Sequence, residues 1–177
     1  DALTRLAGVL YRRAPTADEV DRLLAFRALQ RQGADEATAL RRTVELMLQA
    51  PAFLFRRETP APSVGHQWLT GPELVTRLAF VFWSRGPDAA LLAQAQTLDV
   101  AQADQVRALA AQMLDDPRAR EGVGRFHVEW LGVNRLRTAT RADSRFEALR
   151  QPLQDEVAQF GAAAVLDEPT WHSLWAG

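Results

Sequence analysis

Cysteine is absent from the 177 residues of this chain. Its absence excludes disulfides, thiolate metal sites and haem attached through thioether bonds. Lysine and isoleucine are absent as well, and Asn134 is the only asparagine. These three amino acids have AT-rich codons, so we expect a gene from a high-GC bacterium. All 21 basic residues are arginine, and we attribute most of them to this codon bias rather than to phosphate contacts.

The chain also lacks a surplus of charge and a long apolar run. Its formal net charge is -1, with both signs interleaved along the polar faces, whereas a nucleic-acid surface needs a clustered basic stripe. The longest apolar run covers residues 78–83, far short of the roughly 20 residues that a membrane span needs. We therefore expect no nucleic-acid partner and no membrane span.

Apolar residues recur at helical spacing almost throughout the chain, and no alternating strand pattern is present. We predict an all-α fold of about eight helices. Thr16 with Glu19, and Thr70 with Glu73, form capping boxes that begin two of these helices. Each box pairs a hydroxyl and a carboxylate with the backbone N–H groups of a helix start.

Single residues predict further helix details. Gly33 is predicted to end the second helix as a C′ residue, and Pro51 to interrupt the third. Pro152 either begins or kinks the last long helix. The apolar face of the third helix is predicted to contain Leu40, Val44, Met47 and Leu48.

A stretch rich in proline and small residues, 59–69, is the clearest linker. It separates an N-terminal helical domain of three helices, residues 1–58, from a second helical domain, residues 70–177. We expect the small unit to pack on the larger helical array, because each alone is small for a stable core. The chain starts without Met and inside a helix, so we expect a longer parent protein and a second domain truncated at its C-terminus.

No catalytic constellation or phosphate loop is visible, so the catalytic residues are unknown and an enzymatic role stays undecided. The candidates for ligand binding are Trp83, Asp88, Arg118 and Trp130. Trp83 ends a helix beside a turn, so we expect it to be partly exposed. Helical phase places Trp130 with Phe126 as a core anchor. Asp116 is predicted to cap a helix, and Arg118 to form an ion pair with an acid such as Asp88 or Glu129.

The three histidines, His66, His127 and His172, are scattered. His127 and Glu129 lie two residues apart on a helix, so they point to different faces and do not share a metal ion. We expect no metal site and no cofactor in this chain. Trp171 and Trp175 share one face of the final turn, where an exposed patch would drive self-association.

Several segments together resemble a tandem of helical domains of unknown function. RRAPTADEVDRLLAF and LMLQAPAFLFRRE resemble the first domain; LVTRLAFVFWSRGPDAALL, MLDDPRAREGVGRFHVEWLGV and FEALRQPLQDEVAQF resemble the second. This tandem occurs in large exported proteins of planctomycetes and myxobacteria, which often carry a cytochrome-c-like domain. The resemblance implies a periplasmic or extracellular location, with other domains of the parent protein as partners. Any haem would be bound elsewhere in the parent, because this chain has no CxxCH motif.

Two hypotheses about function follow. The first is a non-catalytic structural or interaction module of an exported, cytochrome-c-associated protein. The second is an enzyme domain that acts on a polymer or a small molecule, with a cleft near Trp83 and Asp88. The second predicts convergent polar groups with shifted pKa values in that cleft.

Overall fold

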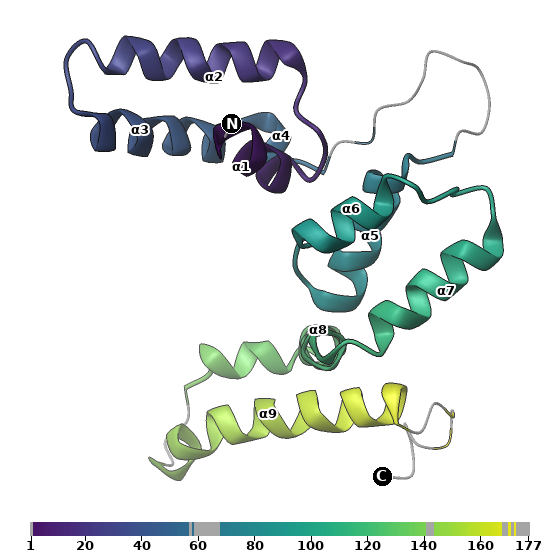
Figure 1. Ribbon diagram of the computed structural model, residues 1–177. Helices are drawn as coiled ribbons and strands as arrows, with labels where there is room; N and C mark the ends of the chain where they lie inside the picture. The colour runs from purple at the N-terminus through teal and green to yellow at the C-terminus, as the bar shows by residue number, and fades with distance from the viewer. Residues whose placement is uncertain are drawn as a thin grey trace. The chain divides into compact units, whose positions relative to one another are not determined.

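The computed structural model of the chain describes residues 2–56, 58, 68–140, 144–167, 170 and 172. These residues hold nine α-helices, one short 3-10 helix and no strand, which confirms the predicted all-α fold (Figure 1). The helices are α1 (Ala2–Tyr11), α2 (Ala17–Gln30), α3 (Glu36–Gln49), α4 (Pro51–Leu54), α5 (Gly71–Trp83), α6 (Ala89–Ala95), α7 (Ala103–Leu114), α8 (Pro117–Trp130), η1 (Val133–Arg137) and α9 (Ser144–Leu166). No helix within these residues has both the length and the apolar character that a membrane crossing requires.

The chain divides into two compact units, which are described separately. The first unit comprises Asp1–Arg77 and Pro87–Ala103, and the second comprises Leu78–Gly86 and Asp104–Gly177. The division falls within α5, so the first part of this helix belongs to one unit and its last part to the other.

The first unit is built around a helical hairpin, α2 and α3, with α1 and α4 in contact with it (Figure 1). Helix α1 buries Leu3, Ala7 and Tyr11, which are spaced four residues apart and therefore share one face. These three side chains form a core cluster with Leu23 of α2 and Met47 of α3. The cluster joins segments that lie more than forty residues apart in the sequence.

The buried face of α3 agrees with the predicted one at Met47 and differs from it at the leucines. The buried residues are Ala39, Thr43 and Met47, whereas Leu40 and Leu48 are 41% and 40% exposed. Two of the three residues that α3 buries, Ala39 and Thr43, therefore have small side chains. The buried hydroxyl of Thr43 donates to the carbonyl of Ala39 at 2.8 Å, so it adds no unsatisfied polar atom to the core.

The helix ends agree with the sequence at most of the predicted residues. The Thr16–Glu19 capping box has both of its hydrogen bonds, and the amide of Thr70 donates to Glu73 at 2.8 Å. As predicted, α3 ends just before Pro51, which begins α4. Gly33 is a wrong prediction, because α2 ends at Gln30 with a right-handed cap residue and Gly33 has no positive φ.

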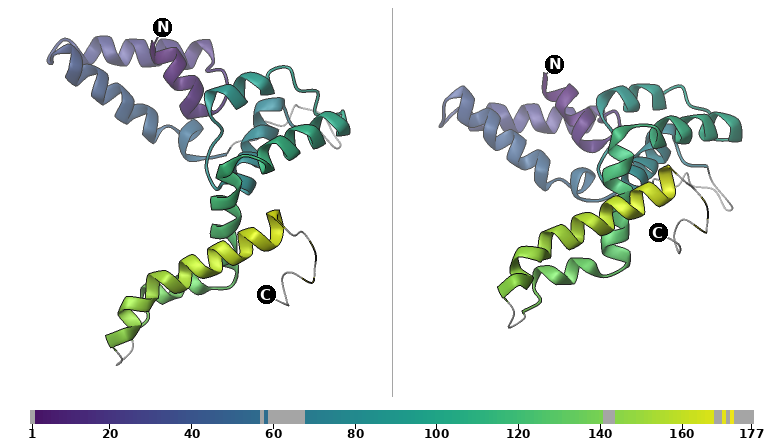
Figure 2. Two further views of the ribbon diagram at one scale, coloured as in Figure 1. Left: turned by 60° about the horizontal axis from the view of Figure 1, so that its bottom comes forward. Right: turned by 90° about the horizontal axis from the view of Figure 1, so that it is seen from below.

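In the second unit, α8 and α9 pack against each other and cross (Figure 2). Glycines make this contact close. A Cβ atom at Gly124 would lie 2.8 Å from the carbonyl oxygen of Ala158, and one at Gly161 would overlap the His127 side chain. Pro152 lies inside α9, so the alternative that it begins the helix is wrong. Small residues therefore set the distance between these two helices.

Candidate functional site

Trp83 ends α5 and lies inside the second unit, not at its surface. It is 3% exposed, and its indole Nε1 donates to the carbonyl oxygen of Met113 at 2.9 Å. The expectation of partial exposure is wrong, because the end of α7 supplies an acceptor for the indole N–H and the start of α8 covers the ring. A buried ring whose only donor is already bonded contributes to the core.

The residue that covers this ring is Arg118, in the first turn of α8. Its guanidinium carbon lies 3.6 Å from the centroid of the Trp83 ring, a cation–π contact. Its Nη2 also forms an ion pair with Asp116 Oδ2 at 2.6 Å. The predicted pairing with Asp88 or Glu129 stays a prediction.

Asp116 caps α8, as the sequence predicts. Its carboxylate accepts from the amide of Arg118 at 2.9 Å, and Pro117 follows at the first helical position. The hydrogen bonds from the Arg118 side chain, with those from its backbone, lower the pKa of Asp116 to about 2. Asp116 is therefore ionised at neutral pH, and its carboxylate is hydrogen-bonded to the start of its own helix.

Asp88 begins α6 in the first unit, as its N-cap. Its side chain is at the surface and accepts from the amide of Leu91 at 2.8 Å. This is the local role that aspartate most often has before a helix. Whether Asp88 also contributes to a ligand site stays a prediction.

Trp130 is a wrong prediction as a core anchor. It is 64% exposed and Phe126 is 56% exposed. Their rings stack with centroids 5.9 Å apart and an angle of 15° between planes. The buried residues of α8 are instead Ala119, Gly122, Gly124 and His127. The close approach of the neighbouring helices selects this small-residue face and leaves the aromatic face outside.

His127 is the polar residue of that buried face. It is 5% exposed, and its Nδ1 lies 2.8 Å from the carbonyl oxygen of Val123. Within the described part of the chain, no group of three or more His, Cys, Asp or Glu residues could hold a metal ion. His66, Trp171 and Trp175 lie outside the described residues, so self-association through the two tryptophans stays a prediction.

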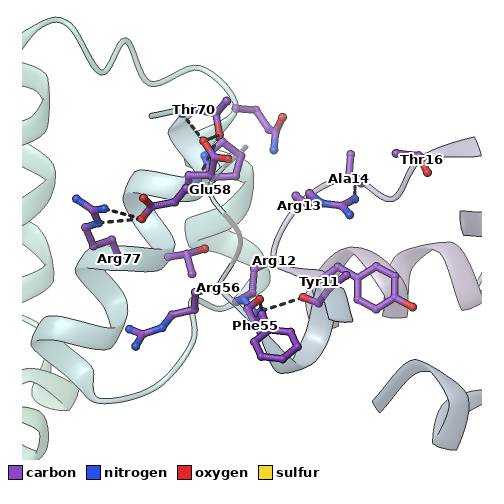
Figure 3. Close-up of a pocket in the computed structure, with 15 residues that line it drawn as sticks. Tyr11, Arg12, Arg13, Ala14, Thr16, Phe55, Arg56, Glu58, Thr70 and Arg77 are labelled. Atoms are coloured by element: carbon purple, nitrogen blue, oxygen red, sulfur yellow. Dashed lines mark hydrogen bonds and ion pairs between the residues drawn. The ribbon is translucent and has the colours of Figure 1, made fainter. Parts of the chain in front are cut away.

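The first unit contains a pocket that no sequence pattern predicted (Figure 3). It has a volume of about 840 Å³, and its walls come from the loop between α1 and α2, the end of α4 and the start of α5. Four arginines line it: Arg12, Arg13, Arg56 and Arg77. Three of them occur in arginine doublets of the sequence, which the codon bias of a high-GC gene also explains.

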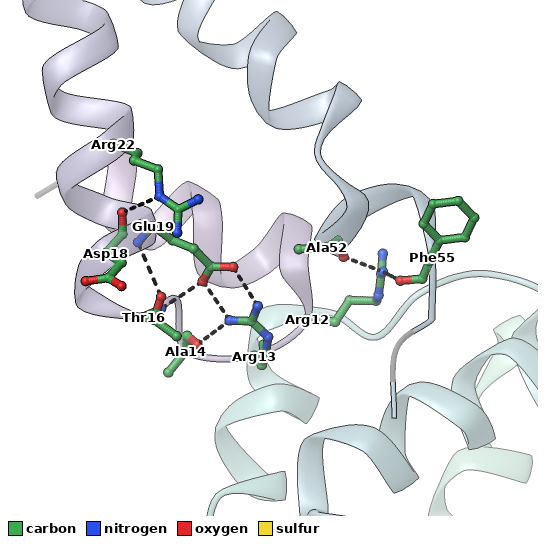
Figure 4. Close-up of polar contacts among 9 residues, drawn as sticks. All are labelled: Arg12, Arg13, Ala14, Thr16, Asp18, Glu19, Arg22, Ala52 and Phe55. Carbon is green, nitrogen blue, oxygen red and sulfur yellow. Dashed lines mark hydrogen bonds and ion pairs between the residues drawn. The ribbon is translucent and has the colours of Figure 1, made fainter. Parts of the chain in front are cut away.

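Arg13 and Arg77 are each paired with a carboxylate. Arg13 forms a two-pronged ion pair with Glu19 at 2.7 and 2.8 Å (Figure 4). The hydrogen bonds from Arg13, assisted by those from Thr16, lower the pKa of Glu19 to about 2. Arg77 forms an ion pair with Glu58 at 2.6 Å. Arg13 therefore links the pocket to the start of α2, where Glu19 completes the capping box.

Arg12 is bound differently, by carbonyl oxygens. It has a left-handed backbone with a φ of 57°, which costs a non-glycine residue about 1 kcal/mol. Its guanidinium donates to the carbonyls of Ala52 and Phe55 (Figure 4) and to that of Phe53, at 3.0 to 3.1 Å. These oxygens lie at the C-terminal end of α4, where a cation is favoured. The strained backbone thus directs a positive charge toward the end of a neighbouring helix.

Comparisons with known proteins identify two domains. Residues 69–173 match a family described as "Protein of unknown function (DUF1592)", and residues 1–58 match one described as "Protein of unknown function (DUF1595)". No curated protein and no solved structure matches the chain. The DUF1592 match covers more than half of the 177 residues, and the chain therefore belongs to this family of unknown function.

Proposed function

We propose that this chain is a non-catalytic helical module that docks another domain of a larger exported protein. The resemblance to the tandem domains of such proteins supports this role. It also supports a periplasmic or extracellular location and a cytochrome-c-like neighbour that carries the haem. In this role the module is a structural partner of that redox domain.

The observation that carries the proposal is the exposed aromatic pair at the end of α8. Phe126 and Trp130 are more than half exposed, although their rings stack on each other. Leu131 follows and is 57% exposed. Grouped exposed apolar side chains mark interaction surfaces, and tryptophan is enriched among the residues that contribute most to binding.

The lowered pKa values of two carboxylates, those of Glu19 and Asp116, support a structural role as well. Glu19 and Asp116 both have a pKa of about 2, so each is a weak base at neutral pH. Both are hydrogen-bonded to a nearby arginine and to a helix start. These hydrogen bonds stabilise the starts of α2 and α8.

Amide hydrogen exchange tests the docking role in the full-length parent protein. We expect residues 126–131 to exchange more slowly in the parent than in the isolated chain, because a neighbouring domain covers them there. A parent with Phe126→Ser and Trp130→Ser should lose this protection. Leu29→Ser, at a residue that is 58% exposed on α2, is the control. Equal exchange of residues 126–131 in both proteins would contradict the docking surface.

An activity screen tests the non-catalytic part. The purified chain is incubated with glycosides, carboxylic esters and phosphate esters, and we expect no turnover above buffer. Turnover that a single substitution in the chain abolishes would overturn the proposal. A haem spectrum of the parent with and without residues 1–177 should be unchanged, because this chain has no CxxCH motif.

A further inference from the structure

The exposed aromatic pair at the end of α8 is followed by a concentration of positive charge. Residues 125–150 hold six arginines and three acidic residues, although the formal net charge of the whole chain is -1. This stretch runs from the end of α8 through η1 to the first turns of α9, and η1 contacts both of these helices. The apolar surface of Phe126, Trp130 and Leu131 therefore borders a basic segment.

Two of these arginines, Arg135 and Arg137, lie on η1, and both are exposed. Within the described ranges, neither side chain makes a hydrogen bond or an ion pair. Arg125 of α8, by contrast, is paired with Glu121 at 3.1 Å. The short helix thus presents two positive charges to the solvent.

The described acidic residues of the stretch are not bonded to η1. Glu147 is paired with Arg150 at 2.6 Å, and Asp143 lies outside the described residues. Glu129 is exposed, and its carboxylate has no partner in the part of the chain that the structure describes. The surface therefore combines the two positive charges of η1 with one negative charge, beside exposed apolar side chains.

The side chain of Arg135 is directed back toward the end of α8. Gly132 has a left-handed backbone with a φ of 70°, and its carbonyl accepts from the amide of Arg135 at 3.1 Å. A Cβ atom at Gly132 would lie 3.8 Å from Nε and 3.9 Å from Cζ of Arg135. Because Leu131 directly precedes Gly132, this guanidinium lies at the edge of the apolar surface.

We infer that the docking surface of α8 binds a face of the neighbouring domain in which apolar side chains are bordered by carboxylates. The apolar side chains of that face cover Phe126 and Trp130, and its carboxylates form ion pairs with Arg135 and Arg137. This inference rests on the proposed docking function and adds the chemistry of the partner.

A folded domain fits this surface better than a membrane or a nucleic acid does. Both of the latter bring closely spaced phosphates, which attract arginines but repel the exposed carboxylate of Glu129. Binding of single strands also uses aromatic faces that are open for base stacking, whereas Phe126 and Trp130 stack on each other. A protein face can place carboxylates opposite η1 and a hydrogen-bond donor opposite Glu129.

Salt dependence of amide hydrogen exchange in the full-length parent protein tests the charge of the partner. Exposed ion pairs are screened at high ionic strength, whereas apolar contacts are not. We expect the protection of residues 126–131 to be about fivefold lower at about 500 mM than at about 50 mM sodium chloride.

Paired substitutions locate the charges. Arg135→Gln with Arg137→Gln should lower this protection about tenfold in the parent, as expected for the loss of two partly exposed ion pairs. The same pair should leave the exchange of residues 126–131 unchanged in the isolated chain, which excludes a local effect on α8. Arg41→Gln with Arg107→Gln changes the net charge equally at exposed arginines of α3 and α7, and should alter the protection less than about twofold. Circular dichroism checks that each variant folds.

The outcomes separate this inference from the docking function. Protection that is the same at both salt concentrations and in the Arg135→Gln, Arg137→Gln parent would overturn the acidic partner and leave the docking surface intact. No protection in the wild-type parent would overturn the docking function itself. Binding of the isolated chain to phosphatidylglycerol vesicles or to a single-stranded DNA oligonucleotide, abolished by Trp130→Ser, would assign the surface to a phosphate-bearing partner and overturn the inference.

Discussion

The guanidinium of Arg118 lies 3.6 Å from the centre of the Trp83 ring. The same side chain is paired with Asp116 at 2.6 Å, and the indole N–H of Trp83 is bonded to Met113. One arginine thus connects the N-cap of α8 to the last residue of α5. The polar groups around the buried Trp83 ring are thus bonded to one another. The contribution of this contact to the free energy of unfolding can be measured.

A double-mutant cycle between Trp83→Leu and Arg118→Gln measures that contribution. We expect a coupling energy of about 1 kcal/mol in the free energy of unfolding, because a partly desolvated cation–π contact has this strength. Urea unfolding followed by circular dichroism supplies the four values. A cycle on the exposed pair Arg107 and Asp104 is the control and should give a coupling near zero. Additive effects at positions 83 and 118 would contradict the finding.

The lowered pKa of Glu19 predicts that the stability of the first unit falls in acid. This pKa is about 2, against an ordinary value of 4.5. A carboxylate with a lowered folded-state pKa stabilises the fold above pH 4.5, and this stabilisation is lost as the pH falls from 4.5 toward 2. The free energy of unfolding should therefore fall less steeply across this window in Glu19→Gln than in the wild type. Parallel curves for the two proteins would show that the Arg13 pair contributes nothing.

Gly122 is predicted to tolerate no side chain. A Cβ atom there would overlap the carbonyl oxygen of Phe82 and lie 2.8 Å from the Cα of Trp83. Because these are backbone atoms, α5 must shift, and we expect Gly122→Ala to lower the free energy of unfolding by about 3 kcal/mol. Gly33→Ala is the control, since no atom lies within 4 Å of its Cβ position. It should be neutral or stabilising by about 0.5 kcal/mol, and equal losses at both positions would refute the clash.

The helix starts were predictable from the sequence because each depends on a few neighbouring residues. Thr16, Thr70 and Asp116 cap their helices as predicted, since a cap needs only a side-chain oxygen and amide groups two or three residues away. The all-α class followed from the same local spacing. These features require no knowledge of what packs against each helix.

The buried faces and the pocket were not predictable, because they depend on contacts between distant segments. Hydrophobicity alone favoured Leu40 and Trp130 as core residues, whereas the helices pack through small residues such as Ala39 and Gly124. The pocket brings Arg12 together with residues at 52–58 and 70–77. No local sequence pattern shows that these segments meet. Because arginine is abundant along the whole chain, the arginines of the pocket do not stand out in the sequence.

The corrected position of Trp130 leads to a prediction that separates size from burial. Trp130 is 64% exposed, whereas the smaller Met113 is 1% exposed. Trp130→Ala should change the free energy of unfolding by less than about 1 kcal/mol, because most of the side chain is already in water. Met113→Ala should cost about 3 kcal/mol, because it leaves a cavity in the core. Urea unfolding of both variants checks which substitution costs more stability. A larger loss for Trp130→Ala than for Met113→Ala would show that Trp130 is a core anchor. The exposed surface on which the docking role rests would then not exist.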